Sequence, residues 1–266
     1  MTTAASEAEL EEGRMSLIEH LTELRTRLIK SAVAIGVGGV VAWIFYPQIV
    51  EFLIEPYSGI CDNTVPGDTP GANPECQLLV TDPLEPFTVR LTVAGYGGLA
   101  LAMPFLLWQL WRFVSPGLYA RERRYGLIFV FAGFALFVLG AGLAYWSLPR
   151  ALSFLDTIGG ENLVSFFSPD RYLKFVVKMM AAFGLGFQFP IVLIFLQLAG
   201  LVDNKTLRAG RQYAAVGIVV LTAVITPSGD PFTLLVLTVP MYVFYEFAIL
   251  FGRLRDRRHR RAAASS

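Results

Sequence analysis

The sequence predicts an all-α integral membrane protein in which six transmembrane helices form a curved bundle, with short fifth and sixth helices. Of its 266 residues, 55% are hydrophobic and 16% are charged, which is more apolar than an ordinary soluble domain. Of the 22 Lys and Arg residues, 17 lie in four short segments separated by apolar stretches: residues 14–30, 112–124, 205–211 and 253–261. Because cytoplasmic loops retain Lys and Arg, all four segments and both termini are predicted to face the cytoplasm.

One membrane domain is predicted, residues 16–252, between two polar tails. Residues 1–15 are acidic and are expected to be disordered, whereas residues 253–266 form a basic cytoplasmic tail. The polar start lacks the early apolar core of a removable signal peptide, so the first span is expected to direct insertion into the cell membrane. The net charge of +1 hides a segregation of sign across the bilayer, and we expect no nucleic-acid binding.

Four apolar stretches are long enough to cross a bilayer, which takes about 20 residues: residues 28–46, 87–111, 125–146 and 172–199. Residues 213–225 are shorter, but they must also cross, because the basic segments on either side of residues 213–251 face the same compartment. The Pro- and Gly-containing turn 226–231 reverses the chain, and the sixth span is 232–251. Such a short fifth span implies a thinned bilayer or partner helices, unless Gln212 and Thr226 extend it.

Three prolines lie inside predicted spans, and each is expected to kink its helix and curve the bundle. They are Pro104, Pro190 and Pro240. Asp230 immediately precedes the sixth span, where a carboxylate caps a helix and complements its dipole.

The outer connection 47–85 carries no Lys or Arg and contains both cysteines, Cys61 and Cys76. A disulfide persists in an oxidising outer compartment, and closing this loop would contribute about 3 kcal/mol in the chain-entropy treatment. Two free thiols are the alternative. The second outer connection, 147–171, gives no indication of its role.

No catalytic or metal-binding pattern is present in the sequence. The only histidines, His20 and His259, have no metal-ligand spacing, and nucleotide-binding, nucleophile-elbow and C-x-x-C motifs are missing. We therefore expect neither an enzyme nor a cofactor.

Two basic segments each contain a carboxylate that stands out. In residues 16–28, leucines recur at helical spacing beside Glu23. The alternative there is a membrane-surface helix in which Glu23 pairs with Arg27 four residues later. In residues 113–124, Glu122 stands among three arginines, and the alternative is a simple topology signal.

The stretches HLTELRTRL and FVSPGLYARERR resemble the TatC family of twin-arginine protein translocases. The resemblance continues in order along nearly the whole chain. Further matches are Thr81-Asp82-Pro83, Pro86-Phe87, Phe183-Gly184-Leu185-Gly186-Phe187, Phe189-Pro190, Thr226-Pro227 with Asp230, and Pro240-Met241-Tyr242 with Glu246.

This resemblance implies a receptor that binds the adjacent arginines of a signal peptide at the cytoplasmic face, on behalf of folded cargo. On the matching positions, Glu23 and Glu122 face the two arginines, since a carboxylate accepts two parallel bonds from a guanidinium and a lysine cannot reproduce that fork. Arg25 contributes to the architecture of the site. Phe113 packs on the peptide, or it is a core aromatic.

The resemblance also implies single-span TatA-like and TatB-like partners, and a homo-oligomer within a larger complex. Glu246 lies inside the sixth span, where an acid must face protein or water, and an inter-subunit or inter-helix role is expected. Gln188 occupies a position at which many relatives carry Glu. It is expected to hydrogen bond a partner subunit, or another helix of this chain.

A secondary transporter for a small solute is the alternative function, with Glu246, Gln188 and Asp230 as an intramembrane relay. Such carriers are often built from inverted repeats. Residues 28–146 and 172–251 show no self-similarity, which favours the receptor.

Overall fold

A computed structural model describes residues 17–61, 80, 82–114, 126–159, 168–198, 200–226 and 230–264. These residues form helices and no strands, so the all-helical prediction is confirmed. The helices are α2 (Leu17–Ile44), α3 (Tyr46–Cys61), α4 (Glu85–Val114), α5 (Gly126–Gly159), α6 (Pro169–Gly186), α7 (Phe189–Leu198), α8 (Asn204–Ala209), α9 (Arg211–Ile225) and α10 (Pro231–Ala264).

Five helical stretches among the described residues are long and apolar enough to cross a membrane. They are Leu21–Ile44, Glu85–Phe113, Gly126–Phe154, Pro169–Leu198 and Pro231–Leu254. Helix α9 is apolar but has only 15 residues, which corresponds to about 22 Å at 1.5 Å per residue. The described structure therefore gives five candidate spans and one shorter apolar helix.

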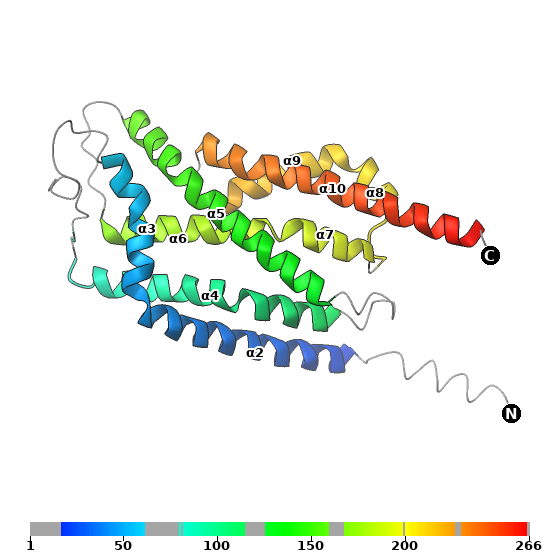
Figure 1. The fold of residues 1–266 in the computed structure, drawn as a ribbon, viewed down its shortest axis with the longest axis horizontal. Coiled ribbons are helices and arrows are strands. Elements are labelled where there is room, and N and C mark those ends of the chain that lie inside the picture. Colours follow the sequence, from blue (N-terminus) through cyan, green and yellow to red (C-terminus); the bar gives the residue numbers. More distant parts are fainter. Residues whose placement is uncertain are drawn as a thin grey trace.

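Helices α2, α4 and α5 run alternately in opposite directions along the bundle, α6 and α7 follow one another in the same direction, and α9 and α10 run opposite to each other (Figure 1). The start of α2, the end of α4, helix α8 and the end of α10 lie at one end, which we call the basic end because the described parts of the four basic segments meet there. The start of α4, the end of α5 and the start of α6 lie at the opposite end. We call it the outer end, because the sequence predicts that it faces away from the cytoplasm.

Helices α2 and α4 pack side by side through glycines. A Cβ atom on Gly98 would lie 2.5 Å from the backbone nitrogen of Gly39 and 2.6 Å from the carbonyl oxygen of Ile35, and one on Gly38 would lie 2.7 Å from the carbonyl oxygen of Gly98. Small residues permit this close backbone approach between membrane helices. The glycines thereby fix the register of α2 against α4.

The main core lies where α6 packs against α4, α5 and α10. Its largest fully buried side chains include Tyr172, Phe183, Met179, Leu237 and Met241. On α5, a Cβ atom on Gly140 would lie 2.6 Å from the carbonyl oxygen of Phe183, so this glycine allows α5 to cross α6 closely.

Helix α3 crosses the outer end of the bundle (Figure 1) and contacts α4, α5 and α6. The Tyr172 hydroxyl on α6 donates to the carbonyl oxygen of Leu53 at 3.0 Å, and the Phe52 and Tyr145 rings stack with centroids 4.4 Å apart. The sequence predicted connections over 47–85 and 147–171 and no helix within them. The structure has a helix over Tyr46–Cys61 in the first, and α5 continues to Gly159 in the second.

The three prolines occupy two different situations. Pro104 and Pro240 lie inside continuous helices. Pro190 is the second residue of α7 and follows a turn at Phe187 and Gln188 that separates α6 from α7, as suits a residue that lacks the N–H of a helix interior. The predicted curvature at Pro104 and Pro240 stays a prediction.

Candidate functional site

At the basic end, Glu23 on α2 forms an ion pair with Arg27, one turn along the same helix. Both Nε and a terminal nitrogen of Arg27 donate to Glu23 Oε1, the former at 3.0 Å. The side chains are 22% and 15% exposed, so the pair is largely shielded. This is the helix-surface pair that the i, i+4 spacing predicted as the alternative for Glu23.

Arg27 also joins α2 to the last turns of α4. Its remaining N–H groups donate to Gln109 Oε1 at 3.3 Å and to the carbonyl oxygen of Arg112 at 3.2 Å. Gln109 is itself buried. No sequence pattern predicted this bridge, because its acceptors lie more than 80 residues away along the chain.

The second carboxylate oxygen of Glu23, Oε2, is enclosed and has no hydrogen-bond partner in the described part of the chain. A buried acceptor on an ionised group is costly to leave unpaired. Of the two carboxylate oxygens of Glu23, Oε1 thus accepts hydrogen bonds from a guanidinium, and Oε2 has no donor among the described residues. The carboxylate lies where α2 meets the last turns of α4.

Of the other residues predicted to bind a signal peptide, the structure describes Arg25 and Phe113 but not Glu122. Arg25 is exposed, and Phe113 is partly buried one residue beyond Arg112. Glu122 lies outside the described residues, as do Cys76 and the side chain of Cys61, so the distance from Glu23 to Glu122 and the disulfide both stay predictions.

Gln188 sits in the turn between α6 and α7 and reaches α5. Its Nε2 donates to the carbonyl oxygen of Gly133 at 2.9 Å, while its Oε1 is enclosed and without a partner among the described residues. The amide therefore forms a helix-helix hydrogen bond within this chain.

Glu246 on α10 forms an ion pair with Arg211 on the first turn of α9, at 2.7 Å. One residue earlier, the Tyr245 hydroxyl donates to the carbonyl oxygen of Leu207 at 2.6 Å. The acid is thus neutralised by a neighbouring helix, and α8, α9 and α10 are held together near the basic end.

Asp230 is buried before the first turn of α10. Its Oδ1 accepts a bond of 2.7 Å from the backbone N–H of Thr233, and its Oδ2 accepts from the Thr233 hydroxyl. This geometry is that of a helix N-cap.

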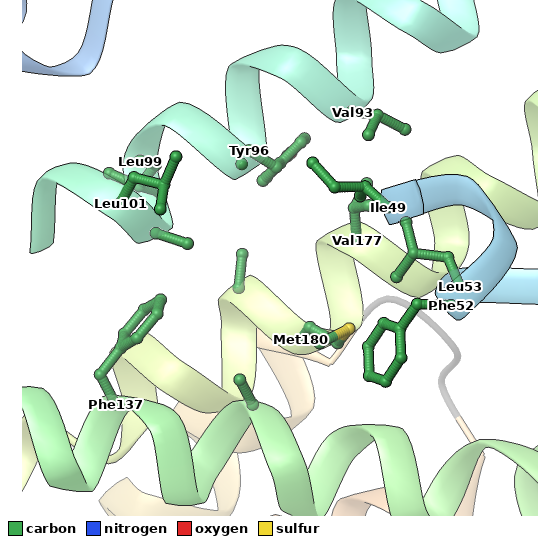
Figure 2. A pocket seen from close by; sticks show the side chains of 14 residues that line it. Ile49, Phe52, Leu53, Val93, Tyr96, Leu99, Leu101, Phe137, Val177 and Met180 are labelled. Carbon is green, nitrogen blue, oxygen red and sulfur yellow. The ribbon is translucent and has the colours of Figure 1, made fainter. Parts of the chain in front are cut away.

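An apolar cavity of about 270 Å³ opens between α3, α4, α5 and α6, toward the outer end. Figure 2 shows Leu99 and Leu101 of α4 facing Phe137 of α5 across it, with Phe52 of α3 and Met180 of α6 at its other side. Nothing in this lining offers catalytic chemistry, and the described residues contain no group of His, Cys, Asp or Glu able to hold a metal.

The geometry and the sequence were compared with known proteins. The profile of the family described as Sec-independent protein translocase protein (TatC) matches residues 19–240. The chain belongs to the TatC family. It is 40% identical to the Sec-independent protein translocase protein TatC of Frankia casuarinae, over 97% of this chain and 71% of that one. With the TatC protein of Aquifex aeolicus it shares 36% identity, over 92% of this chain and 97% of that one.

Solved structures agree with this membership. A crystal structure described as the twin arginine translocase receptor TatC in DDM superposes with a TM-score of 0.72 and 36% identity, covering 88% of this chain and 99% of that one. This TatC-family chain is therefore a multi-pass membrane component of a protein translocase and not an enzyme. The solute-transporter alternative is not retained.

Proposed function

We propose that this chain is the receptor of a twin-arginine export system and binds the Arg-Arg signal peptide of folded cargo at its basic end. The observation that carries the proposal is the Glu23 carboxylate, which lies where α2 meets the last turns of α4. It already accepts a guanidinium through Oε1, and its Oε2 has no partner among the described residues. The Glu23 carboxylate can therefore accept hydrogen bonds from the guanidinium of a signal arginine.

Glu23 and Glu122 are proposed to bind one arginine each. A carboxylate accepts two parallel N–H bonds from a planar guanidinium, whereas an ammonium presents a compact point charge. Phe113 and Arg25 complete the site, the first by packing on the peptide and the second by shaping the surface around Glu23. The position of Phe113 next to Arg112, whose carbonyl oxygen binds Arg27, supports this assignment.

The proposed topology places the basic end in the cytoplasm, with six crossings and both termini inside. Helix α9 runs back along the bundle between α8 and α10 (Figure 1), which supports its assignment as the fifth crossing. Tyr213, Val216 and Val224 on α9 are exposed. We propose that TatA-like and TatB-like single-span helices, or a locally thinned bilayer, compensate for the short length of α9.

Glu246, Gln188 and Asp230 do not form a relay by any contact within the described residues. Each is bound to a different partner: Arg211, the Gly133 carbonyl oxygen and Thr233, respectively. These partners support structural roles and remove the basis for the solute carrier.

The test is site-specific photo-crosslinking from positions 22 and 26, which are exposed beside Glu23 on α2 and leave both carboxylates in place, to a precursor whose signal peptide carries Arg-Arg or Lys-Lys. We expect strong crosslinks to the Arg-Arg precursor and weak ones to the Lys-Lys precursor, because only the guanidinium reproduces the fork. Position 48, exposed on α3 at the outer end, serves as the control. Equal yields with both precursors would contradict the proposal.

A further inference from the structure

We propose that Arg27 is an internal guanidinium ligand of Glu23 that a signal arginine must displace, and that this competition lowers the affinity of the site for signal peptides. The inference rests on the proposed function, because it concerns the same carboxylate. It makes Arg27 a residue that sets the affinity of the site, although Arg27 itself does not contact the peptide in the closed state.

The first step is that Glu23 is closed to an incoming cation in this structure. Arg27 occupies Oε1 with two donors, and Oε2 is enclosed. A signal arginine that is to form a two-bond fork with Glu23 must therefore move Arg27 aside and open Oε2.

The second step is that Arg27 has somewhere else to bind. A guanidinium carries five N–H donors, and Arg27 already uses some of them on α4, at Gln109 Oε1 and the Arg112 carbonyl oxygen. These acceptors hold the guanidinium at the interface when it releases Glu23, so the exchange does not leave a buried charge without hydrogen bonds.

The third step is the balance of the exchange. Oε2 has no partner among the described residues, and an incoming guanidinium that engages both oxygens of Glu23 replaces the bonds that Arg27 gives up. Displacing Arg27 costs the same whichever cation arrives, because the closed state is the same. Arg27 therefore lowers the affinity for both peptides by one factor, while the preference for Arg-Arg comes from the fork that only a guanidinium makes.

The experiment measures binding of fluorescent signal peptides, Arg-Arg or Lys-Lys, to the full-length chain in lipid nanodiscs. Arg27→Met removes the internal ligand at similar side-chain length. Lys30→Met removes one positive charge from the same helix at an exposed position and is the matched control. Arg27→Lys keeps the charge and removes the fork.

We expect Arg27→Met to raise the affinities for the Arg-Arg and Lys-Lys peptides by the same factor, about fivefold or more, so that the preference is kept. Arg27→Lys should change both affinities in the same direction, and it replaces Arg27→Met if that variant does not insert. Lys30→Met should leave both affinities as in the wild type.

An unchanged or weaker affinity for the Arg-Arg peptide in folded Arg27→Met or Arg27→Lys would overturn the competition. The proposed function is judged separately by the wild type and Glu23→Gln. If the wild type prefers Arg-Arg and Glu23→Gln loses that binding, the receptor assignment stands whatever the Arg27 variants show. If the wild type shows no preference, both proposals fail.

Discussion

Gln188 Nε2 donates to the carbonyl oxygen of Gly133 at 2.9 Å, and this bond ties the turn between α6 and α7 to the first quarter of α5. The α6–α7 turn interrupts a membrane-spanning stretch, where backbone groups have no water to bind. The bond therefore links the helix interruption between α6 and α7 to the neighbouring helix α5.

Replacing Gln188 with Met should lower the stability of the folded protein by about 1 kcal/mol, because the apolar side chain cannot donate to the Gly133 carbonyl. Thermal unfolding in detergent measures this change. Gln48→Met, at an exposed position on α3, is the control. An equal melting temperature for Gln188→Met and the wild type would show that the bond contributes nothing.

The α2–α4 interface offers a matched pair of glycines on one helix. Gly98→Ala places a Cβ atom 2.5 Å from the Gly39 nitrogen, whereas a Cβ atom on Gly95 meets nothing within 4 Å. We expect Gly98→Ala to destabilise the protein by about 1 to 3 kcal/mol, and Gly95→Ala to be neutral or to stabilise it by up to about 1 kcal/mol through helix propensity. Melting temperatures that fall equally in both variants would contradict this packing.

The Arg211–Glu246 pair is measurable by a double-mutant cycle. The two side chains are 41% and 36% exposed, so solvent screening limits the coupling to about 0.5 to 1 kcal/mol. Arg211→Ala and Glu246→Ala should each weaken the contact between α9 and α10, and the double variant should be less destabilised than the sum. Strict additivity would indicate that the ion pair carries no net stability.

Arg90, near the outer end of α4, lies over two aromatic rings. Its Cζ is 4.6 Å from the Trp43 ring centroid and 5.1 Å from that of Tyr46, and it donates to the Trp43 carbonyl oxygen at 3.2 Å. Burial raises the pKa of Tyr46, although the Arg90 charge opposes this, so the phenol stays neutral at pH 7.

Because a planar guanidinium stacks and an ammonium does not, Arg90→Lys should lose about 0.5 to 1 kcal/mol of stability despite keeping its charge. Thermal unfolding of Arg90→Lys beside Arg150→Lys checks this. Arg150 stacks 4.0 Å from the Trp146 ring centroid on its own helix at an exposed site, so its loss should be smaller. A larger effect at Arg150 would refute the argument.

The sequence was informative wherever a signal is local. Helical spacing within residues 16–28 was enough to predict the Glu23–Arg27 pair, and the position of Asp230 before an apolar stretch was enough to predict a cap. Helix α3 was missed because 16 residues without flanking Lys or Arg give neither a span length nor an orientation signal.

The long-range contacts were beyond any single-sequence pattern. Gln109 meets Arg27 only because Gly38 and Gly98 set the α2–α4 register through backbone contacts, and a one-turn shift would separate them. Gln188 binds a backbone carbonyl oxygen on α5, an acceptor that every residue carries and that no side-chain pattern can indicate. The glycines at the α2–α4 interface set the helix register on which the contact of Arg27 with Gln109 depends. Their role can be recognised only when the position of the neighbouring helix is known.

Helix α3 has a mechanical consequence for the whole molecule. Helix α3 contacts α4, α5 and α6, and the Leu53 carbonyl oxygen accepts the Tyr172 hydroxyl, so α3 ties these three helices together at the outer end. Because they are held at that end, we expect any separation between them to be larger at the basic end.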